Sequence, residues 1–434
     1  MPPTALEPLH RFHSYCARFP SEIVETALEK YTKPGDSVFD PFCGSGTTLV
    51  ACLAHRRKAI GTDIDILAGM LTELKSKPYT RDRYDVWRER FASQLSEHFA
   101  DITQSWMKNA LPPLGKNWLL GSLQLPIPGF PELRYWFPPQ LTAALAAIAQ
   151  AAHECEERHF EQVALVSLSA SIIAKWPNTL SYAMDIDHTR PHRRVQRFTL
   201  DRVLTAYLAR LDRSITCLSE LHRIYTEANG VQTFAEAARV VYPHDARTAA
   251  PHLENESQTL VVTSPPYFNA VDYPRAHRLS VCWMNGYSPD NLVSRRQYIG
   301  LRHAGVFNGE TWLKERPMVR QLIPTSIHRK EAVVRRLCAF YADLEAVLRH
   351  CWNALRAGGH ALFVIANNVI QGKRIESHRI LAELAKRLGF QEKRIDTREI
   401  APIRRRFPVG PFGFDGPMTH EYLIVLRKPR HTSR

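Results

Sequence analysis

The fold is decided by residues 37–48, which read Ser-Val-Phe-Asp-Pro-Phe-Cys-Gly-Ser-Gly-Thr-Thr. The apolar start, Ser37–Asp40, predicts a short strand, and residues 49–55 carry apolar side chains at helical spacing. Between them, Gly44 and Gly46 allow a tight turn and close approach of a ligand to the backbone. The first turn of the helix offers free N–H groups to such a ligand. The sequence therefore predicts strand, glycine turn and helix.

A second strand is predicted at Lys58–Thr62, and it ends at Asp63. An acidic residue at the end of the second strand typically hydrogen-bonds a ribose diol. The third glycine of the dinucleotide pattern G-x-G-x-x-G is missing from the turn. The combination of glycine turn and acid predicts a site for a cofactor that contains adenosine.

Another motif, Ser264-Pro265-Pro266-Tyr267, follows the apolar run 259–263. The run is rich in β-branched residues and reads as a buried strand that Pro265 ends. The two prolines make the turn rigid, so a hydroxyl, backbone carbonyls and a flat ring are held at the carboxyl edge of a sheet. This arrangement suits a planar substrate with an amino group, such as a nucleobase out of its stack. For the motif alone, a strand end with a packed Tyr is an equal interpretation.

Taken together, Asp40–Thr48 and Thr263–Tyr267 resemble the amino-group DNA methyltransferases that use S-adenosyl-L-methionine. The Ser-Pro-Pro-Tyr form resembles the N4-cytosine branch of that family. The resemblance covers residues 10–65 and about 236–427. It implies an α/β protein with a Rossmann-like class I methyltransferase sheet, closed by an antiparallel hairpin, plus a mainly helical insertion.

The resemblance also implies roles for individual residues. Ser264 Oγ and the Pro265 carbonyl would accept hydrogen bonds from the amine, Pro266 would stiffen the turn, and Tyr267 would stack on the flipped base. Serine is a weak base, so the amine proton is expected to leave to water. Cofactor contacts are expected at Tyr15, Arg18, Phe19, Asp40, Phe42, Gly44, Gly46, Thr47, Thr48, Asp63, Asp245 and Thr263.

The charge of the chain points to a polyanionic partner. The 434 residues carry a formal net charge of +14, and residues 295–336 hold ten Lys or Arg against three Glu. Such a segment would neutralise phosphates and make binding strongly salt-dependent. We expect double-stranded DNA as the partner, with contacts at Arg193, Arg194, Arg275, Arg295, Arg296, Arg302 and Lys314.

The length suggests one large domain with an insertion, or two domains. We predict a catalytic domain from residues 1–65 and 236–434, and a helical insertion at 66–235 for target recognition or dimerisation. Within the insertion, residues 140–175 read as one helix, whereas residues 286–330 look irregular. The oligomeric state and the recognised DNA sequence are left open.

Several protein classes are disfavoured by composition. No apolar stretch is long enough for a membrane span, and the first residues lack a signal pattern. The eight cysteines are scattered without a C-x-x-C pair, which argues against zinc and disulfides and for the cytoplasm. No metal site is predicted. The absence of a Pro-Cys dipeptide argues against carbon-5 cytosine methylation.

Three other functions stay open. N6-adenine DNA methylation uses the same residue types, and RNA (tRNA) amino-group methyltransferases use a similar glycine motif. A non-catalytic nucleic-acid-binding protein with an inactive cofactor fold is the third, and failure to bind S-adenosylmethionine would favour it. If a restriction endonuclease accompanies the enzyme, we expect it to be a separate chain.

Overall fold

The computed structural model divides the chain into two compact units. The sheet unit comprises Phe19–Gly69, Val231–Asp272 and Val293–Arg434, and the helical unit comprises Met1–Arg18, Met70–Gly230 and Tyr273–Leu292. The structure describes residues 6–15, 18, 20–106, 110–174, 178–182, 198–230, 234–268, 272–284, 297–300, 307–370, 372–400 and 419–430. The predicted division at 65/66 and 235/236, with its assigned roles, stays a prediction.

The sheet unit is built on seven described strands in the order β10-β11-β7-β6-β1-β2-β5. From β7 to β5 neighbouring strands run parallel, and β11 and β10 complete the sheet as an antiparallel hairpin. The predicted fold class is therefore confirmed. The strands are β1 (Ser37–Asp40), β2 (Lys58–Thr62), β5 (Ala238–Val241), β6 (Gln258–Thr263), β7 (Leu355–Ala366), β10 (Gln391–Glu399) and β11 (His420–Arg427).

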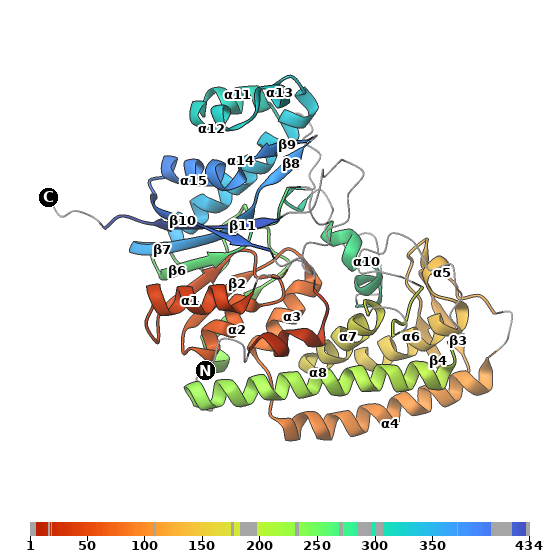
Figure 1. Ribbon diagram of the computed structural model, residues 1–434. Helices are drawn as coiled ribbons and strands as arrows, with labels where there is room; N and C mark the ends of the chain where they lie inside the picture. The colour runs from red at the N-terminus through yellow and green to blue at the C-terminus, as the bar shows by residue number, and fades with distance from the viewer. Residues whose placement is uncertain are drawn as a thin grey trace. The chain divides into compact units, whose positions relative to one another are not determined.

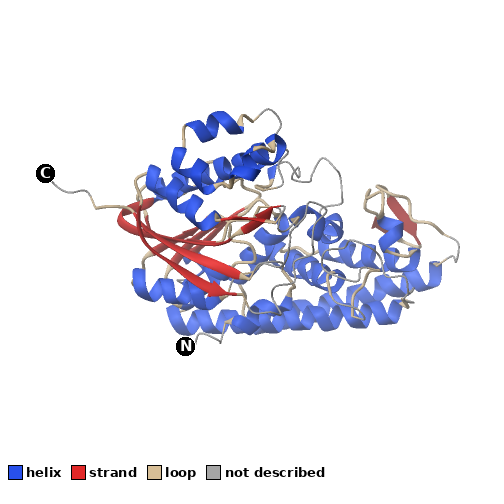
Figure 2. Cartoon of the chain, turned by 45° about the horizontal axis from the view of Figure 1, so that its top comes forward, coloured by secondary structure: helices blue, strands red, loops and turns tan. Residues whose placement is uncertain are grey.

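Helices cover both faces of this sheet, as Figures 1 and 2 show. On one face lie α1 (Ser21–Tyr31) and α2 (Thr47–Ala54), and on the other lie α14 (Glu331–Ala354) and α15 (Ser377–Arg387). A sheet buried on both faces needs near-continuous apolar strands, and all six residues of β6 are buried. The core on the α14 face joins Val261, Phe363 and Leu344.

The sheet unit also contains short helices that precede α14 in the sequence and a small hairpin that follows β7. They are α11 (Gly309–Lys314), α12 (Pro317–Leu322) and α13 (Thr325–His328), and the hairpin of β8 (Asn368–Ile370) and β9 (Lys373–Ile375). The expectation that 286–330 is irregular is wrong for 309–328. The Asn308 side chain accepts from Thr311 N and begins α11, while Leu313 and Val319 are fully buried. A short α9 (Phe234–Ala237) precedes β5.

The helical unit packs long amphipathic helices. Its elements are η2 (Glu7–Phe12), α4 (Arg81–Ser105), β3 (Asn117–Leu120), β4 (Leu123–Pro126), α5 (Leu133–Trp136), α6 (Pro139–His153), α7 (Arg158–Ile172), α8 (Leu200–Asn229) and α10 (Tyr273–Met284). The single helix expected at 140–175 is wrong, because it breaks after His153 at a polar turn and returns as α7 against α6. Among the described residues no helix is long and apolar enough to span a bilayer. The boundary between the units falls within α3 (Ile66–Ser76).

The glycine turn rests directly on β2. A Cβ atom at Gly61 would lie 2.9 Å from Cys43 Cβ and 2.7 Å from Leu49 Cδ1. Real Cβ contacts are longer than this, so only glycine lets the turn and the start of α2 approach the strand this closely.

We expect Gly61→Ala to lower the free energy of unfolding by about 1–3 kcal/mol, because the added methyl group overpacks this contact. Denaturant unfolding of the purified protein measures the change. Adding Cys43→Gly should recover part of the loss, since it removes the facing Cβ. Equal stability of Gly61→Ala and the unsubstituted protein would show that the contact relaxes freely.

Candidate active site

The residues singled out by the motifs follow strands that end at one edge of the sheet. Asp40 ends β1, Asp63 follows β2, Asp245 comes after β5, and Ser264 follows β6. The parallel register of β6, β1, β2 and β5 brings these carboxyl ends together. In the sheet, β2 lies on one side of β1 and β6 lies on the other, so the strand order reverses at β1. Open α/β sheets bind ligands at such a point, beside the carboxyl ends of the strands.

Asp40 is the buried centre of this edge. Asp40 is only 1% exposed. Its carboxylate accepts hydrogen bonds from Thr263 Oγ1 at 2.6 Å, Thr48 Oγ1 at 2.6 Å and Phe42 N at 3.0 Å. One carboxylate therefore holds together the end of β6, the first turn of α2 and the glycine turn. Burial raises the pKa of Asp40 to about 6, against the lowering effect of the two threonine hydroxyls and the Phe42 N–H. A direct contact of Asp40 with the cofactor stays a prediction.

The glycine turn is fixed by Asp63. Gly44 N donates to Asp63 Oδ2 at 2.8 Å, and Asp65 N donates to Asp63 Oδ1 at 2.9 Å. Gly44 and Gly46 have φ of 52° and 85°, in the left-handed region that favours glycine. Burial, and then the charge of Asp65, raise the pKa of Asp63 to about 7.

These residues fit an adenosine-containing cofactor. Each oxygen of the Asp63 carboxylate accepts one backbone N–H in the described structure, so lone pairs are left for two further donors such as a ribose diol. Thr47 and Thr48 are buried in the first turn of α2, beside the turn. Phe42 is half-buried and packs against the core of the unit.

The Ser264–Tyr267 turn, predicted to be catalytic, is also anchored. Ser264 Oγ donates to the Val364 carbonyl of β7 at 3.1 Å, and Pro265 is buried. Pro266 and Tyr267 are half-buried, and Tyr267 packs against the core on the α14 face. The Ser264 proton is thus directed into the sheet.

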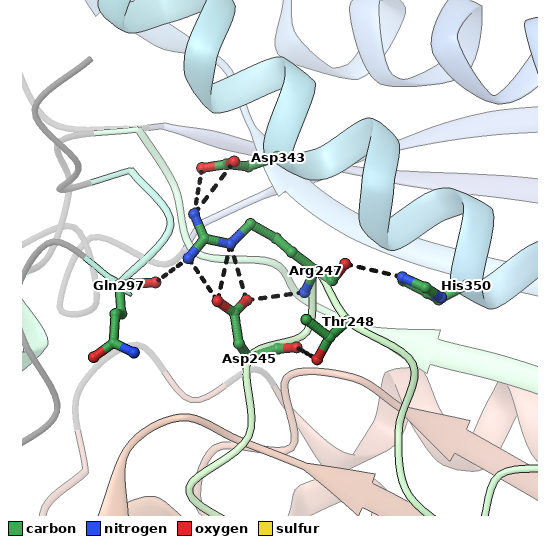
Figure 3. A network of polar contacts seen from close by, with 6 residues as sticks. All are labelled: Asp245, Arg247, Thr248, Gln297, Asp343 and His350. Carbon is green, nitrogen blue, oxygen red and sulfur yellow. Dashed lines mark hydrogen bonds and ion pairs between the residues drawn. The ribbon is translucent and has the colours of Figure 1, made fainter. Parts of the chain in front are cut away.

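Asp245 lies in a network that the sequence did not reveal (Figure 3). Arg247 Nε and Nη2 donate to Asp245 Oδ1 and Oδ2 at 2.9 and 2.6 Å, and Arg247 Nη1 lies 3.4 Å from both carboxylate oxygens of Asp343. Arg247 lowers the pKa of Asp245 against the effect of burial, which raises it. The spacing of Asp245 and Arg247 was visible in the sequence. Asp343, on α14, carried no signal because it lies 96 positions further along the chain.

Tyr15, Arg18 and Arg275 belong to the helical unit rather than to the sheet unit that carries the other site residues. Their roles at the site stay predictions. The Tyr15 ring stacks with the Tyr273 ring at a centroid distance of 6.3 Å, and the Arg18 guanidinium binds Glu7 at 3.1 and 2.7 Å. Arg275 lies in α10.

The remaining predicted contacts concern DNA. Lys314 is exposed on α11, whereas Arg316 and Arg320 of the basic segment pair with Glu345 and Glu310. Those ion pairs reduce the charge that the segment offers to phosphates. Outside the described residues lie Phe19, Arg193, Arg194, Arg295, Arg296 and Arg302.

Comparison with known proteins agrees with this geometry. The family described as DNA methylase matches residues 3–68, which contain the glycine turn and Asp63. The type II methyltransferase M.MvaI of Kocuria varians is 23% identical over 443 aligned positions, which span 96% of this chain and 90% of the relative.

The family match and the type II relatives together support the amino-group DNA methyltransferase family for this chain. The type II methyltransferase M.AvaI of Nostoc sp. is a further relative, 21% identical over 90% of this chain and 80% of its own length. A SAM-dependent methyltransferase structure from Methanosarcina mazei shares 7% identity over 93% of this chain and 98% of that one, with a TM-score of 0.31.

We expect the raised pKa of Asp63 to make the affinity for an adenosine-containing cofactor depend on pH. Ribose hydroxyls donate to an ionised carboxylate, and Asp63 ionises as the pH rises through about 7. We expect S-adenosylmethionine to bind roughly tenfold more weakly at pH 6 than at pH 8, because the ionised fraction falls from about nine tenths to about one tenth. Isothermal titration calorimetry at the two pH values measures the ratio.

Asp63→Asn serves as the control, because it keeps the shape but not the titration. Its weaker affinity should change much less between pH 6 and pH 8. Any pH dependence of affinity that remains in Asp63→Asn comes from titration of the cofactor or of other groups of the protein. The same pH dependence in both proteins would contradict the role of Asp63.

Proposed function

We propose that this enzyme transfers the methyl group of S-adenosylmethionine to the exocyclic N4 amine of a flipped cytosine in DNA. The observation that carries the proposal is the anchored Ser264-Pro265-Pro266-Tyr267 turn at the carboxyl end of β6, tied through Thr263 and Asp40 to the glycine turn. A serine in the first position is the feature that favours N4-cytosine over N6-adenine.

The amine of cytosine is a poor nucleophile, because its lone pair is delocalised into the ring. Acceptors fixed beside the two N–H groups favour the pyramidal geometry that frees the lone pair, and they do so most in the transition state. The N4–CH₃ bond forms as the S–CH₃ bond breaks, S-adenosylhomocysteine remains, and the amine gives its proton to water.

Ser264 suits the acceptor role because its own proton is already used. The hydroxyl donates to the buried Val364 carbonyl at 3.1 Å, so the oxygen can offer only lone pairs to an approaching amine. The Pro265 carbonyl is the second proposed acceptor, and Pro266 limits the movement of the turn. The half-buried ring of Tyr267 is the proposed platform for the flipped base.

The cofactor is assigned to the neighbouring strand ends. Bound S-adenosylmethionine supplies an electrophilic methyl group on its sulfonium, and the protein has to align that methyl with the amine. Asp63 is the proposed partner of the ribose, and Asp245 of the adenine. Phe42, Gly44, Gly46, Thr47 and Thr48 form the proposed turn around the cofactor, with Tyr15, Arg18 and Phe19 near the methionine end.

Double-stranded DNA is the proposed macromolecular substrate, and the modification is proposed to mark DNA, either in restriction–modification or as an epigenetic signal. The positive charge of the chain supports the DNA assignment. A target-recognition or dimerisation role for residues 66–235 and a cytoplasmic location are proposed with it, and a restriction endonuclease that accompanies the enzyme is proposed to be a separate chain.

We expect incubation of the enzyme with S-adenosylmethionine and unmethylated DNA to produce N4-methylcytosine, identified by mass spectrometry of the digested nucleosides. N6-methyladenine would keep the residue roles but contradict the base. Methylated RNA with unmodified DNA would contradict the DNA substrate.

In the same assay, Ser264→Ala should lower the rate of methylation about 100-fold or more, the usual effect of removing one preorganised transition-state contact. Its affinity for S-adenosylmethionine should stay within about twofold, since the hydroxyl faces the base. Ser257→Ala is the matched control, because Ser257 precedes the same strand at its other end and is exposed. Equal losses in both variants would contradict the role of Ser264.

A further inference from the structure

Four residues of the sheet unit, Gln297–Gly300, touch the loops that follow three different strands of the catalytic edge. We call this segment the 297–300 strap. Its first contact is with the loop after β5, where Arg247 Nη2 donates to the Gln297 carbonyl at 3.0 Å (Figure 3). The same guanidinium binds Asp245, so the strap and the proposed adenine-side carboxylate share one cation.

The second contact is with the end of β2. Tyr298 is 8% exposed, and its hydroxyl donates to Asp65 Oδ2 at 3.3 Å. The other oxygen, Asp65 Oδ1, accepts from Ala68 N at the start of α3, and Asp65 N binds Asp63. Burial, and then the charges of Asp65, Asp63 and Asp272, raise the pKa of the Tyr298 phenol, so it stays protonated and acts as a donor.

The third contact is with the catalytic turn after β6. Gly300 has φ of 87°, and a Cβ on it would lie 3.6 Å from the Tyr267 carbonyl oxygen and 3.8 Å from Phe268 Cα. The backbone of the strap therefore lies against the backbone of the catalytic turn. Between these ends, Ile299 is buried in the core on the α14 face, with Phe340 and Phe268.

The three contacts span the cofactor edge. In the strand order, β5 and β6 are separated by β2 and β1, which is three strand spacings, or about 14 Å. The strap itself forms bends and turns rather than an extended chain, and the side chains of Arg247 and Tyr298 make the contacts that link it to the loops after β5 and β2. Because one short segment contacts all three loops, it restricts movement of the loops after β5 and β2 against the turn after β6.

We propose that the 297–300 strap sets the spacing between the cofactor-binding carboxylates and the catalytic turn, with Tyr298 and Arg247 as positioning residues for methyl transfer. The inference rests on the proposed function. Neither side chain needs to touch the reacting atoms: Tyr298 acts through Asp65 and Asp63, and Arg247 acts through Asp245 and the Gln297 carbonyl.

Tyr298→Phe tests the proposal, because it removes one oxygen and leaves the packed ring. With DNA and S-adenosylmethionine both saturating, we expect kcat to fall about tenfold, the effect of losing one hydrogen bond to a charged group. KM for DNA should stay within about twofold. The rate is measured by transfer of labelled methyl groups to DNA.

Tyr341→Phe is the matched control. Tyr341 is a fully buried tyrosine of α14 whose hydroxyl donates to Ser377 Oγ at 3.0 Å, so the substitution removes a similar bond of the sheet unit that takes no part in the strap contacts. It should leave kcat unchanged. A kcat of Tyr298→Phe within twofold of the unsubstituted enzyme would overturn the proposal, as would equal losses in the two variants.

A double variant distinguishes positioning from a general structural effect. Arg247→Lys keeps the charge but loses the fork that holds Asp245, Asp343 and the Gln297 carbonyl. If both residues act through the strap, Arg247→Lys with Tyr298→Phe should reduce kcat by clearly less than the product of the single losses. Multiplying losses would contradict a shared strap.

The two failures are separable. An unsubstituted enzyme that does not methylate DNA refutes the proposed function, and the strap is then judged by calorimetry with S-adenosylmethionine. There Tyr298→Phe should weaken cofactor affinity several-fold, because Asp63 is held through Asp65. Unchanged cofactor affinity in that case would overturn the strap as well.

Discussion

The site depends on one buried carboxylate. Asp40 accepts from Thr48 on α2, Thr263 on β6 and the Phe42 N–H of the glycine turn, so a single group fixes two motifs that lie more than 200 residues apart in sequence. Its short charge-assisted hydrogen bonds are stronger and more directional than neutral ones. The Thr-Ser-Pro-Pro-Tyr turn therefore does more than end a strand. The Thr263 hydroxyl ties this turn to Asp40, and through Asp40 to the glycine turn. The Ser264 hydroxyl is held by its hydrogen bond to the Val364 carbonyl.

Burying the ionised carboxylates of Asp40 and Asp63 lowers the stability of the folded protein when no ligand is bound. Burial raises the pKa of Asp40 to about 6 and that of Asp63 to about 7. A carboxyl whose pKa is higher in the folded state stabilises the fold fully below its unfolded pKa and loses that contribution as the pH rises through the folded pKa. Near pH 8 both groups are ionised, so hydroxyl and ammonium donors of a bound cofactor would offset part of this unfavourable burial. Active sites commonly retain such groups, because the same groups carry binding and chemistry.

Local patterns predicted the fold well, and long-range contacts were beyond them. The glycine turn, the acidic residue after β2 and the buried run before Ser264 each had a clear signature, because strand alternation and turn chemistry act over a few residues. Asp343 and Val364 gave no signal, since only the packing of α14 and β7 brings them to the site. Tyr298 read as one aromatic residue in an irregular stretch, although its hydroxyl reaches Asp65. The polar turn after His153 was missed because apolar residues on both sides continue the helical period.

We infer that Asp40 couples the glycine turn to the Ser264–Tyr267 turn, and Asp40→Asn tests this coupling most directly. The amide has the same shape but cannot accept both threonine hydroxyls as charge-assisted bonds. The measurement is the single-turnover rate of methyl transfer at pH 8, with cofactor affinity by calorimetry on the same preparation. We predict that the rate and the affinity both fall by about tenfold or more, since one hydrogen bond to a charged group sustains that factor. An Asp40→Asn enzyme that binds cofactor and transfers methyl groups like the unsubstituted protein would contradict the account.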